Sequence, residues 1–426
     1  MSPKPLFNLA ATCVVGYLSA SATDWPVYRG PNHDGISQEK WVATAWPAAG
    51  PKSVWKTPTP GGFSSITVAG GHAYTIVGRP VDGANLEVLV ALDAATGKEL
   101  WAAPLSPSKY DGGGNSGMKG NDGGDGPRST PTRDGDRVYT LDGRLVLACF
   151  EAGSGKEIWR RDIIAEHAGR NITWQSAASP MIEGGLIFVA GGGEGQALLG
   201  IDKVTGKTVW KGENDKMTHA TPVATTILGQ RQVIFFTQSG LVSVRPDNGA
   251  VLWRQSFRYS TSTASSPVVA DDHVYCSAGY GVGAGLYHIT KEGDAFKSTE
   301  VWRAEGKLQN HWSTPVFFKG HLYGLFGFKE YGVCALKCVE LATGKEKWTK
   351  AGFGPGNVTL VDGHLVALAD NGELVIVDAT PEAYHETARA GVLAGKCWST
   401  PTYASGRIYA RSTKESVCVD LAAGAH

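Results

Sequence analysis

The stretch ALDAATGKELW (residues 91–101) decides the fold, because close copies of it return along the chain. Most copies have an apolar residue, an acidic residue two positions later, a short Thr-Gly-Lys type of turn and a closing tryptophan. The others are CFEAGSGKEIW (149–159), GIDKVTGKTVW (200–210), SVRPDNGAVLW (243–253) and CVELATGKEKW (338–348). Trp302 closes a looser copy, and KSVW (52–55) is a half copy. A motif that recurs in this way indicates a repeat architecture.

A second unit alternates with the first. It begins near Ser-Thr-Pro, passes a turn and continues into alternating apolar residues. Its eight turns fall at Gly70-Gly71, Asp134-Gly135, Gly184-Gly185, Leu228-Gly229, Asp271-Asp272, Lys319-Gly320, Asp362-Gly363 and Ser405-Gly406. These copies cover residues 63–421, so the period is about 45 residues. Two hairpin signals in such a period predict four short strands per repeat.

The physical chemistry of the units predicts how the strands pack. Glycine supplies the positive φ that a two-residue hairpin requires. Alternation, as in Arg137-Val138-Tyr139-Thr140, places every second side chain between neighbouring sheets. The tryptophan falls on the outermost strand, where a large ring fills the widening gap between sheets. Together these features predict an all-β fold, an eight-bladed β-propeller of four-stranded antiparallel blades.

The two ends of the repeat region predict how the ring closes. The eighth copy ends at SVCVDL (416–421), before a tryptophan strand. The half copy KSVW is the strand that this blade lacks, so we expect an N-terminal strand to complete the last blade. The predicted organisation is a lead segment over 23–51 and a single propeller over 52–421.

Residues 1–22 have the pattern of a secretory signal peptide. Lys4 gives a positive start, residues 6–18 are mostly apolar, and Ala20-Ser21-Ala22 has the small-x-small form of a cleavage site. The apolar run is too short to span a bilayer. We therefore expect cleavage after Ala22 and a periplasmic or secreted protein with no transmembrane segment. An uncleaved N-terminal anchor is the alternative; a lipid on Cys13 is disfavoured because Thr12 precedes it.

The composition argues against a disordered chain and against a nucleic-acid-binding protein. The chain has 426 residues, of which 42% are hydrophobic and 19% charged, so it can bury a large core. Its 56 glycines fit a fold with many tight turns. Lysine plus arginine equals aspartate plus glutamate, 40 against 40, which favours a monomer without a nucleic-acid partner.

The cysteines leave disulfide pairing open. Six follow the signal peptide, at 149, 276, 334, 338, 397 and 418, and six cysteines allow 15 pairings. No Cys-x-x-Cys is present, which argues against a zinc or thioredoxin-type site. Cys149, Cys338 and Cys418 each lie in an apolar strand pattern and read as small buried residues.

No complete catalytic motif is found. The sequence lacks G-x-S-x-G, H-E-x-x-H and a phosphate-binding G-x-x-x-x-G-K-[ST]. The glycine-rich run 111–126 holds several aspartates, so a Ca²⁺ site is conceivable, although a loop between the first two blades explains it as well. The glycine run 191–195 follows a strand without an evident helix and is interpreted as a blade turn.

Candidate binding residues follow from the predicted geometry. Residues just before the Ser-Thr-Pro units should surround one mouth of the central channel. They are Arg128, Trp174, Gln175, His219, Asn310, His311, Trp312, Lys396 and Trp398. Aromatic rings with Arg, Asn and His suit a sugar or a planar ligand. The alternative is that Trp312 and Trp398 plug the channel and that the histidines bond backbone.

The D-x-x-TG-K-x-x-W repeats resemble the pyrroloquinoline quinone (PQQ) repeat of quinoprotein alcohol dehydrogenase-like propellers, over about residues 24–421. Three stretches resemble exported PQQ-like propellers of planctomycetes and verrucomicrobia still more: 24–37, 126–141 and 395–411. The same unit builds PQQ enzymes and the BamB-type scaffold, which has no cofactor. Family dehydrogenases have a vicinal cysteine pair, a calcium ion and an aspartate base. Here no two cysteines are adjacent, which disfavours PQQ with calcium.

Three functions follow from that resemblance and from the candidate binding residues at the mouth of the channel. We expect an exported, non-catalytic propeller that acts as a scaffold or binding module for envelope proteins, with no cofactor, no metal and no catalytic residue. A PQQ-dependent oxidoreductase acting on alcohols or sugars is the first alternative. A polysaccharide-binding propeller that uses the aromatic mouth for a glycan ligand is the second.

Overall fold

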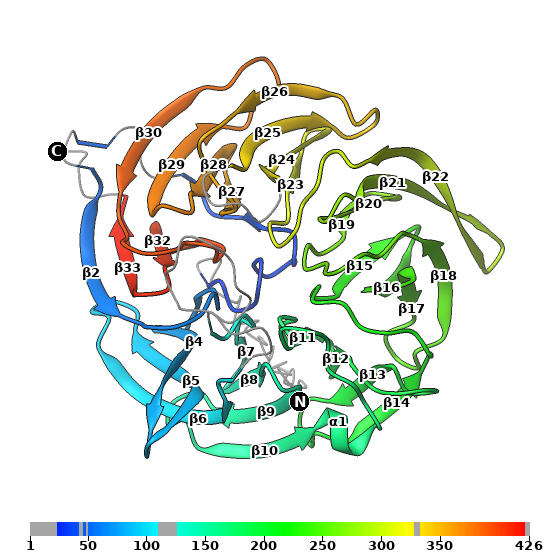
Figure 1. Cartoon of the computed structure of the whole chain (residues 1–426), viewed down its shortest axis with the longest axis horizontal. Helices are drawn as coiled ribbons and strands as arrows, with labels where there is room; N and C mark the ends of the chain where they lie inside the picture. Colours follow the sequence, from blue (N-terminus) through cyan, green and yellow to red (C-terminus); the bar gives the residue numbers. More distant parts are fainter. Residues whose placement is uncertain (1–23, 42–45, 48–49, 110–125, 328–332, 422–426) are drawn as a thin grey trace, which may run out of the picture.

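The computed structural model describes residues 24–41, 46–47, 50–109, 126–327 and 333–421. These residues form eight sheets arranged as a ring around a central axis (Figure 1). The expectation of an eight-bladed β-propeller is therefore confirmed. The predicted signal peptide (1–22) and most of the glycine-rich run 111–126 lie outside the described residues. Within the described residues, no helix is long and apolar enough to cross a membrane.

Each sheet has four antiparallel strands that follow one another from the axis outward, and in the seventh sheet the short strand β1 (Ile36–Ser37) adds a fifth, parallel strand. The strands of the first four sheets are β3 (Thr67–Ala69), β4 (His72–Val81), β5 (Ala84–Asp93), β6 (Glu99–Pro107); β7 (Thr132–Asp134), β8 (Arg137–Leu141), β9 (Val146–Glu151), β10 (Glu157–Asp162); β11 (Met181–Glu183), β12 (Leu186–Ala190), β13 (Leu198–Asp202), β14 (Thr208–Gly212); and β15 (Val223–Ile227), β16 (Gln230–Thr237), β17 (Gly240–Val244), β18 (Val251–Ser256). A short helix, α1 (Ile163–Glu166), follows β10.

The last four sheets repeat this order, with one strand taken from near the N-terminus. Their strands are β19 (Val268–Ala270), β20 (His273–Ala278), β21 (Gly283–Glu292), β22 (Ala295–Glu305); β23 (Val316–Phe318), β24 (His321–Phe326), β25 (Ala335–Glu340), β26 (Glu346–Lys350); β27 (Asn357–Val361), β28 (His364–Leu368), β29 (Glu373–Asp378), β30 (Glu386–Gly391); and β31 (Thr402–Ala404), β32 (Arg407–Arg411), β33 (Glu415–Asp420), β2 (Lys52–Pro58).

The hairpin turns between the first two strands of each sheet agree with the sequence in seven sheets. In the second sheet the prediction was wrong by one residue: β7 extends through Asp134, so the turn is Gly135-Asp136. Gly135 still takes the positive φ of 59° that the turn requires. The glycine run 191–195 connects β12 to β13, as expected of a blade turn.

Closing tryptophans join five of the sheets to the next one around the ring. Trp101 on β6 donates its indole N–H to the carbonyl oxygen of Ala152 in the second sheet, at 3.1 Å. The hydroxyl of Tyr74 on β4 donates to the same carbonyl, also at 3.1 Å. Equivalent indole-to-carbonyl bonds connect Trp55 to Ala94, Trp210 to Pro246, Trp302 to Leu341 and Trp348 to Thr380. The recurring motif is thus a device for docking one blade on its neighbour.

The eighth sheet is built from both ends of the ring. β2 pairs antiparallel with β33 and is its outermost strand. Arg411 on β32, 1% exposed, reaches into the first sheet and donates to the carbonyl oxygens of Ile76 and Gly61, both at 2.6 Å. A buried guanidinium that is satisfied by carbonyls of the neighbouring blade fixes the junction between the last and the first sheet.

The described part of the lead segment, residues 24–41, crosses the centre of the ring (Figure 1, dark blue). Trp25 forms an isolated bridge with Val68 on β3 of the first sheet. Arg29, 3% exposed, donates to the carbonyl oxygen of Thr314 at 2.8 Å, beside β23 of the sixth sheet. β1 (Ile36–Ser37) then pairs in parallel with β27 of the seventh sheet. The lead segment therefore occupies part of the channel, along inner strands on opposite sides of the ring.

The lead segment also fills the junction between the seventh and eighth sheets. The other outermost strands carry a tryptophan next to an irregularity in the strand pairing, as Trp348 does on β26. At the equivalent position β30 carries Ala388. Trp41 and Trp46 pack against the buried cluster of these two sheets. Trp41 stacks on His364 and Tyr403, with ring centroids 5.1 and 5.7 Å apart. Two tryptophans from outside the repeat thus replace the one that the repeat lacks.

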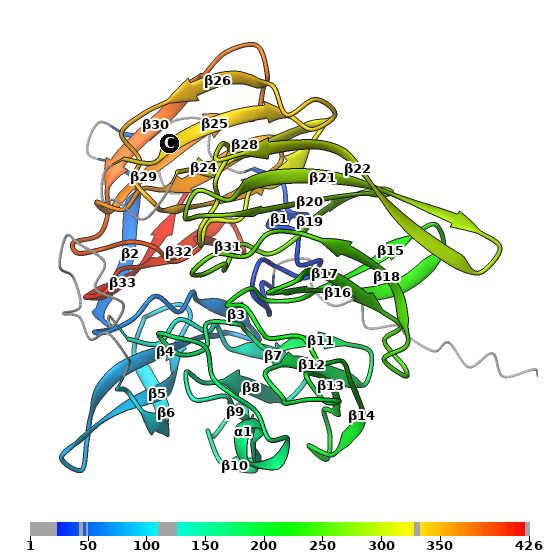
Figure 2. The ribbon, with the colours of Figure 1, turned by 45° about the vertical axis from the view of Figure 1, so that its right-hand side comes forward.

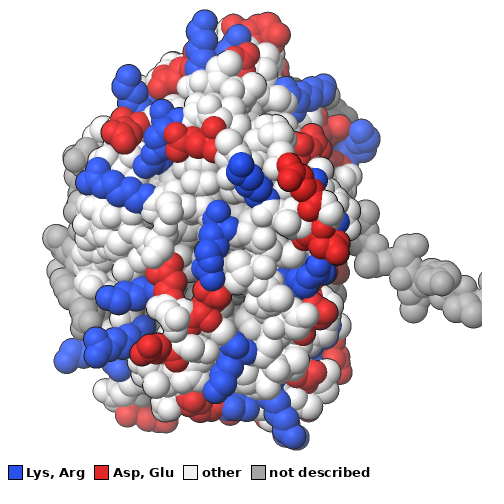
Figure 3. All heavy atoms as spheres, turned by 90° about the vertical axis from the view of Figure 1, so that its right-hand side faces the viewer, with Lys and Arg blue, Asp and Glu red and all other residues white. Residues whose placement is uncertain are grey.

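Charged side chains of both signs lie on the outside of the ring (Figure 3). On the side of the ring shown in Figure 3, basic and acidic side chains are interspersed. Turning the ring by 45° shows the β21–β22 hairpin projecting beyond the other blades (Figure 2). The six cysteines of the described residues are all buried.

Candidate functional site

The segments that enter the innermost strands are tied to one another around the axis. In each case a backbone N–H of one segment donates to the side-chain oxygen of a serine or threonine in a neighbouring blade, at 2.9–3.0 Å. The pairs are Ser65 to Thr130, Thr130 to Ser179, Ser179 to Thr221, Ser266 to Thr314 and Thr400 to Ser65. This belt holds the wall of the channel mouth in a fixed position.

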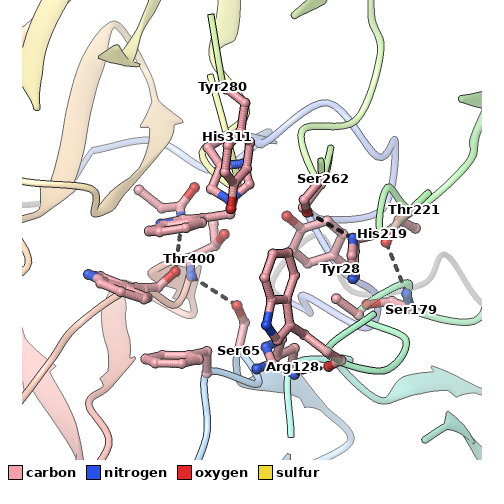
Figure 4. A pocket seen from close by; sticks show the side chains of 17 residues that line it. Tyr28, Ser65, Arg128, Ser179, His219, Thr221, Ser262, Tyr280, His311 and Thr400 are labelled. Carbon is pink, nitrogen blue, oxygen red and sulfur yellow. Dashed lines mark hydrogen bonds between the residues drawn. The ribbon is translucent and has the colours of Figure 1, made fainter. Parts of the chain in front are cut away.

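A cavity of about 280 Å³ lies at this mouth (Figure 4). Its lining comes from the entry segments of most blades and from the lead segment. The lining residues are Tyr28, Phe63, Ser65, Arg128, Trp174, Ala177, Ser179, His219, Thr221, Ser262, Ala264, Tyr280, His311, Trp312, Asn357, Trp398 and Thr400. The volume suits a ligand the size of one or two rings.

Aromatic rings form one wall of the cavity. Trp398 stacks on Phe63 on one side and on Trp312 on the other, with ring centroids 4.9 and 4.3 Å apart. His311 follows Trp312 at 4.4 Å, and Tyr280 meets His311 edge-on at 5.1 Å. The Trp312 indole N–H donates to the carbonyl oxygen of Pro355 at 2.8 Å. Because the rings are packed and anchored, this wall is rigid before any ligand arrives.

The other side of the cavity carries its positive charge. Arg128 is half-buried and donates to the carbonyl oxygen of Trp174 at 2.6 Å. Trp174 and Gln175 have φ values of 68° and 65°, a left-handed conformation that costs energy for residues with a Cβ. No aspartate or glutamate is among the described lining residues, so the charge of Arg128 favours an anionic or neutral ligand.

His219 is held neutral in this site. Its Nε2 lies 3.0 Å from the carbonyl oxygen of Thr173, and its Nδ1 lies 3.0 Å from Oγ of Ser262. The carbonyl can only accept, so Nε2 carries the proton and Nδ1 accepts from Ser262. Burial, with a smaller contribution from the Arg128 charge, lowers the pKa of His219 to about 4. A histidine with both nitrogens bonded and so low a pKa is a poor general base at neutral pH.

The structure brings together six of the nine residues expected at the mouth. Those that line the cavity are Arg128, Trp174, His219, His311, Trp312 and Trp398. Asn310 instead turns into its blade and donates to the carbonyl oxygen of Leu325 at 3.0 Å. Gln175 accepts from Asn171 at 2.6 Å. Lys396 is 1% exposed and lies beneath the ring of Trp398, 4.4 Å from its centroid.

Other lining residues were missed by the sequence argument. Tyr28 comes from the lead segment, which has no repeat to place it, and Phe63 lies just before the first innermost strand. Ser262 and Tyr280 come from the fifth blade, which departs from the repeat. The position of Phe63, two residues before Ser65, would have been the one usable signal.

The described residues do not fit a calcium-bound quinone. Calcium takes six to eight oxygen ligands, mostly carboxylates. The described lining offers no carboxylate, and the amide of Asn357 already donates to the carbonyl oxygen of Trp398 at 2.7 Å. No cysteine is among the described residues that line the cavity. The dehydrogenase chemistry that the repeat suggested therefore has no ligand set here.

Comparison with known proteins places the chain in a family. No curated protein sequence matches it. The solved structure of BamB from Moraxella catarrhalis is 15% identical, with a TM-score of 0.59, over 85% of this chain and 95% of that one. Quinohemoprotein alcohol dehydrogenase from Comamonas testosteroni is 13% identical, with a TM-score of 0.65, over 95% of this chain and 81% of that one. The computationally designed Ika8 protein is 11% identical, with a TM-score of 0.57, over 86% and 99%.

At these identities the solved structures establish the fold alone. The family model described as outer membrane protein assembly factor BamB matches residues 84–315, more than half of the chain. The chain therefore belongs to the BamB-type family of PQQ-like propellers.

Proposed function

We propose that the chain is an exported, non-catalytic propeller of the cell envelope that works as a binding module for envelope proteins. The observation that carries this proposal is the state of the polar groups of His219, Trp312 and Asn357, three residues that line the cavity. The nitrogens of His219, the indole N–H of Trp312 and the amide of Asn357 are all bonded to protein atoms. Such groups hold a shape; they are not poised to transfer protons.

The family supports protein partners. The matching model is described as an outer membrane protein assembly factor, and the match spans blades one to five. Edge strands and loops of a propeller can bind an extended segment of another protein by adding a strand. On this proposal the cavity is a secondary feature that would take a small ligand.

The first experiment separates the binding module from the oxidoreductase. PQQ with Ca²⁺ is added to the full chain, and we measure the melting temperature and the quinone absorbance retained after desalting. We expect no saturable rise and no retained chromophore, because the cavity lacks carboxylates. About one retained PQQ per chain would overturn the non-catalytic proposal.

The second experiment tests the partner. The folded chain and a heat-unfolded sample are immobilised in parallel and exposed to envelope extract. We expect an outer-membrane assembly protein to be retained by the folded chain alone. Retention of no envelope protein, or equal retention by the unfolded sample, would contradict the proposal.

The aromatic wall favours a second candidate function, polysaccharide binding. Stacked tryptophans suit the apolar faces of sugar rings. A Trp174→Ala, Trp398→Ala double variant should then lose signal on a glycan array, while Trp46→Ala, a tryptophan outside the cavity, should retain it. Melting temperatures of all variants show whether they remain folded. Absence of binding to any glycan by the unmodified chain would remove this candidate.

A further inference from the structure

Two histidines and an aspartate meet at the first turn of the fifth blade. Asp272 lies in the turn between β19 and β20, His273 begins β20, and His288 lies directly opposite His273 on β21. The ligand-type atoms of all three lie within 4.8 Å of one another. The turn is at the far end of β19 from Ala264, which lines the central cavity. The cluster is therefore separate from the cavity.

The cluster arises from a departure from the repeat. In six of the other seven blades the first residue of the second strand faces an acidic residue on the third, as in His72 with Asp93, His321 with Glu340 and His364 with Asp378. In the fifth blade the residue opposite His273 is His288, which is not acidic. The acidic residue of the cluster is Asp272, in the turn before His273. Aspartate there replaces the glycine found in most other turns. Two changes from the repeat thus converge on one point.

The distances between the ligand-type atoms are close to those of a metal site, one within the expected range and one somewhat shorter. His273 Nδ1 lies 2.7 Å from Oδ1 of Asp272, and His288 Nε2 lies 3.1 Å from Oδ2. Two ligands of one Zn²⁺, each at about 2.0–2.2 Å, stand roughly 3–3.5 Å apart in tetrahedral geometry. The imidazoles are stacked, with centroids 4.7 Å apart. A small rotation of the side chains would bring both nitrogens and one carboxylate oxygen onto a common centre.

The surroundings leave that centre accessible and negative. All three residues are half-buried, so an ion can enter from solvent. The neighbouring Asp271 is exposed and adds a negative charge. Among the described residues, Asp272 forms ion pairs with the two histidines and with no lysine or arginine. Imidazole and carboxylate ligands suit Zn²⁺ and its neighbours in the first transition row better than Ca²⁺ or Mg²⁺.

We propose that Asp272, His273 and His288 bind one Zn²⁺ ion. Three protein ligands leave a coordination position open, as in exchangeable and catalytic zinc sites. That position would take a water molecule or a donor group of a bound partner. The site lies at the far end of β19 from the central cavity. It therefore does not depend on the scaffold function proposed above.

The test is a Zn²⁺ titration of the full chain, free of a histidine tag and treated with a chelator. We expect about one equivalent per chain by calorimetry, a rise in melting temperature, and a visible absorption band when Co²⁺ replaces Zn²⁺. His288→Gln and Asp272→Ser should each weaken binding at least tenfold. His321→Gln is the control, because His321 has the same strand position and burial as His273 but faces Glu340 instead of a histidine.

A second arm removes the nearest competitor. His385 and His364 both contact Asp378, at 2.6 and 3.6 Å, so His385→Gln is titrated as well. Loss of binding in that variant with retention in His288→Gln would overturn the assignment. So would the absence of saturable Zn²⁺ binding, or an equal affinity for Ca²⁺. The melting temperature of each variant without metal shows whether it remains folded.

Discussion

Gly97 lies against the indole of Trp55, so closely that a Cβ on this glycine would stand 2.6 Å from two ring atoms. The glycine belongs to the Thr-Gly-Lys turn of the first sheet, and the tryptophan closes the eighth. The same contact recurs where Gly206 meets Trp159. The glycine of the repeat is therefore needed twice, for its positive φ of 70° and for the space that the neighbouring ring occupies.

Gly97→Ala should destabilise the protein more than a positive φ alone explains. Alanine in the left-handed region costs about 1 kcal/mol, and the clash with Trp55 adds about 1–3 kcal/mol of overpacking. Gly71→Ala is the control, since Gly71 has φ of 77° but no atom within 4 Å of its missing Cβ. Thermal melts of both variants measure the difference. Equal losses would show that the ring yields and that the docking contact is not a constraint.

Arg411→Met should open the junction between the eighth and first sheets. The substitution leaves the carbonyl oxygens of Ile76 and Gly61 buried without their donor, at a cost of about 3–5 kcal/mol. Limited proteolysis and the melting temperature report the change. Arg79→Met removes a partly exposed ion pair with Glu99 and should cost less than about 1 kcal/mol. A similar effect of the two substitutions would contradict the role given to Arg411.

Acid should destabilise the fold between about pH 6.5 and pH 4. Burial lowers the pKa of His219 and of His33 to about 4, against 6.5 in an unfolded chain. The unfolded state binds protons first as the pH falls, so stability is full above pH 6.5 and is lost toward pH 4. Each buried histidine contributes on the order of 3 kcal/mol to that loss.

His219→Gln should reduce this pH dependence, because glutamine donates to Thr173 without titrating. Melting temperatures of the variant and the unmodified protein, taken from pH 7.5 to pH 4, give the slopes. His72→Gln serves as the control, since His72 lies at the surface and bonds only the carbonyl oxygen of Gly70. An unchanged slope in the His219 variant would mean that other groups cause the acid sensitivity.

Trp46→Ala should loosen the seventh blade against the eighth. The indole packs against the buried cluster shared by the seventh and eighth sheets, and truncation of a half-buried tryptophan costs about 2 kcal/mol or more. Hydrogen exchange should then increase in β30 and β33 before other strands. Uniform exchange around the ring would indicate that the lead segment does not hold this junction.

Much of the fold could be predicted from the sequence because each turn and each tryptophan has a local cause. A two-residue hairpin turn can be recognised from its glycine. Only in the second sheet, where an aspartate stands on each side of the glycine, does the turn lie one residue later than expected, at Gly135-Asp136. The path of the lead segment could not be predicted. Arg29 makes its contacts with Thr314, far along the chain, and no repeat announces that contact.

The candidate site was predictable in position but not in every side chain. Entry segments meet at the channel mouth wherever innermost strands begin, which places Arg128, Trp312 and Trp398 correctly. In an irregular segment, however, no periodicity determines which way a side chain points. Asn310 and Lys396 therefore turned inward, where buried hydrogen bonds and an aromatic face receive them.

The pairing of β2 with β33 imposes an order of events on folding. The ion pair between Lys56 and Glu415 joins residues 359 positions apart, so a ribosome releases one partner long before it makes the other. Until β33 exists, β2 has no strand to pair with and the eighth blade cannot form. Closure of so long a loop is slow, since its entropy is lost before the contacts are gained. The ring can therefore close only after the chain has been synthesised as far as β33 (Glu415–Asp420).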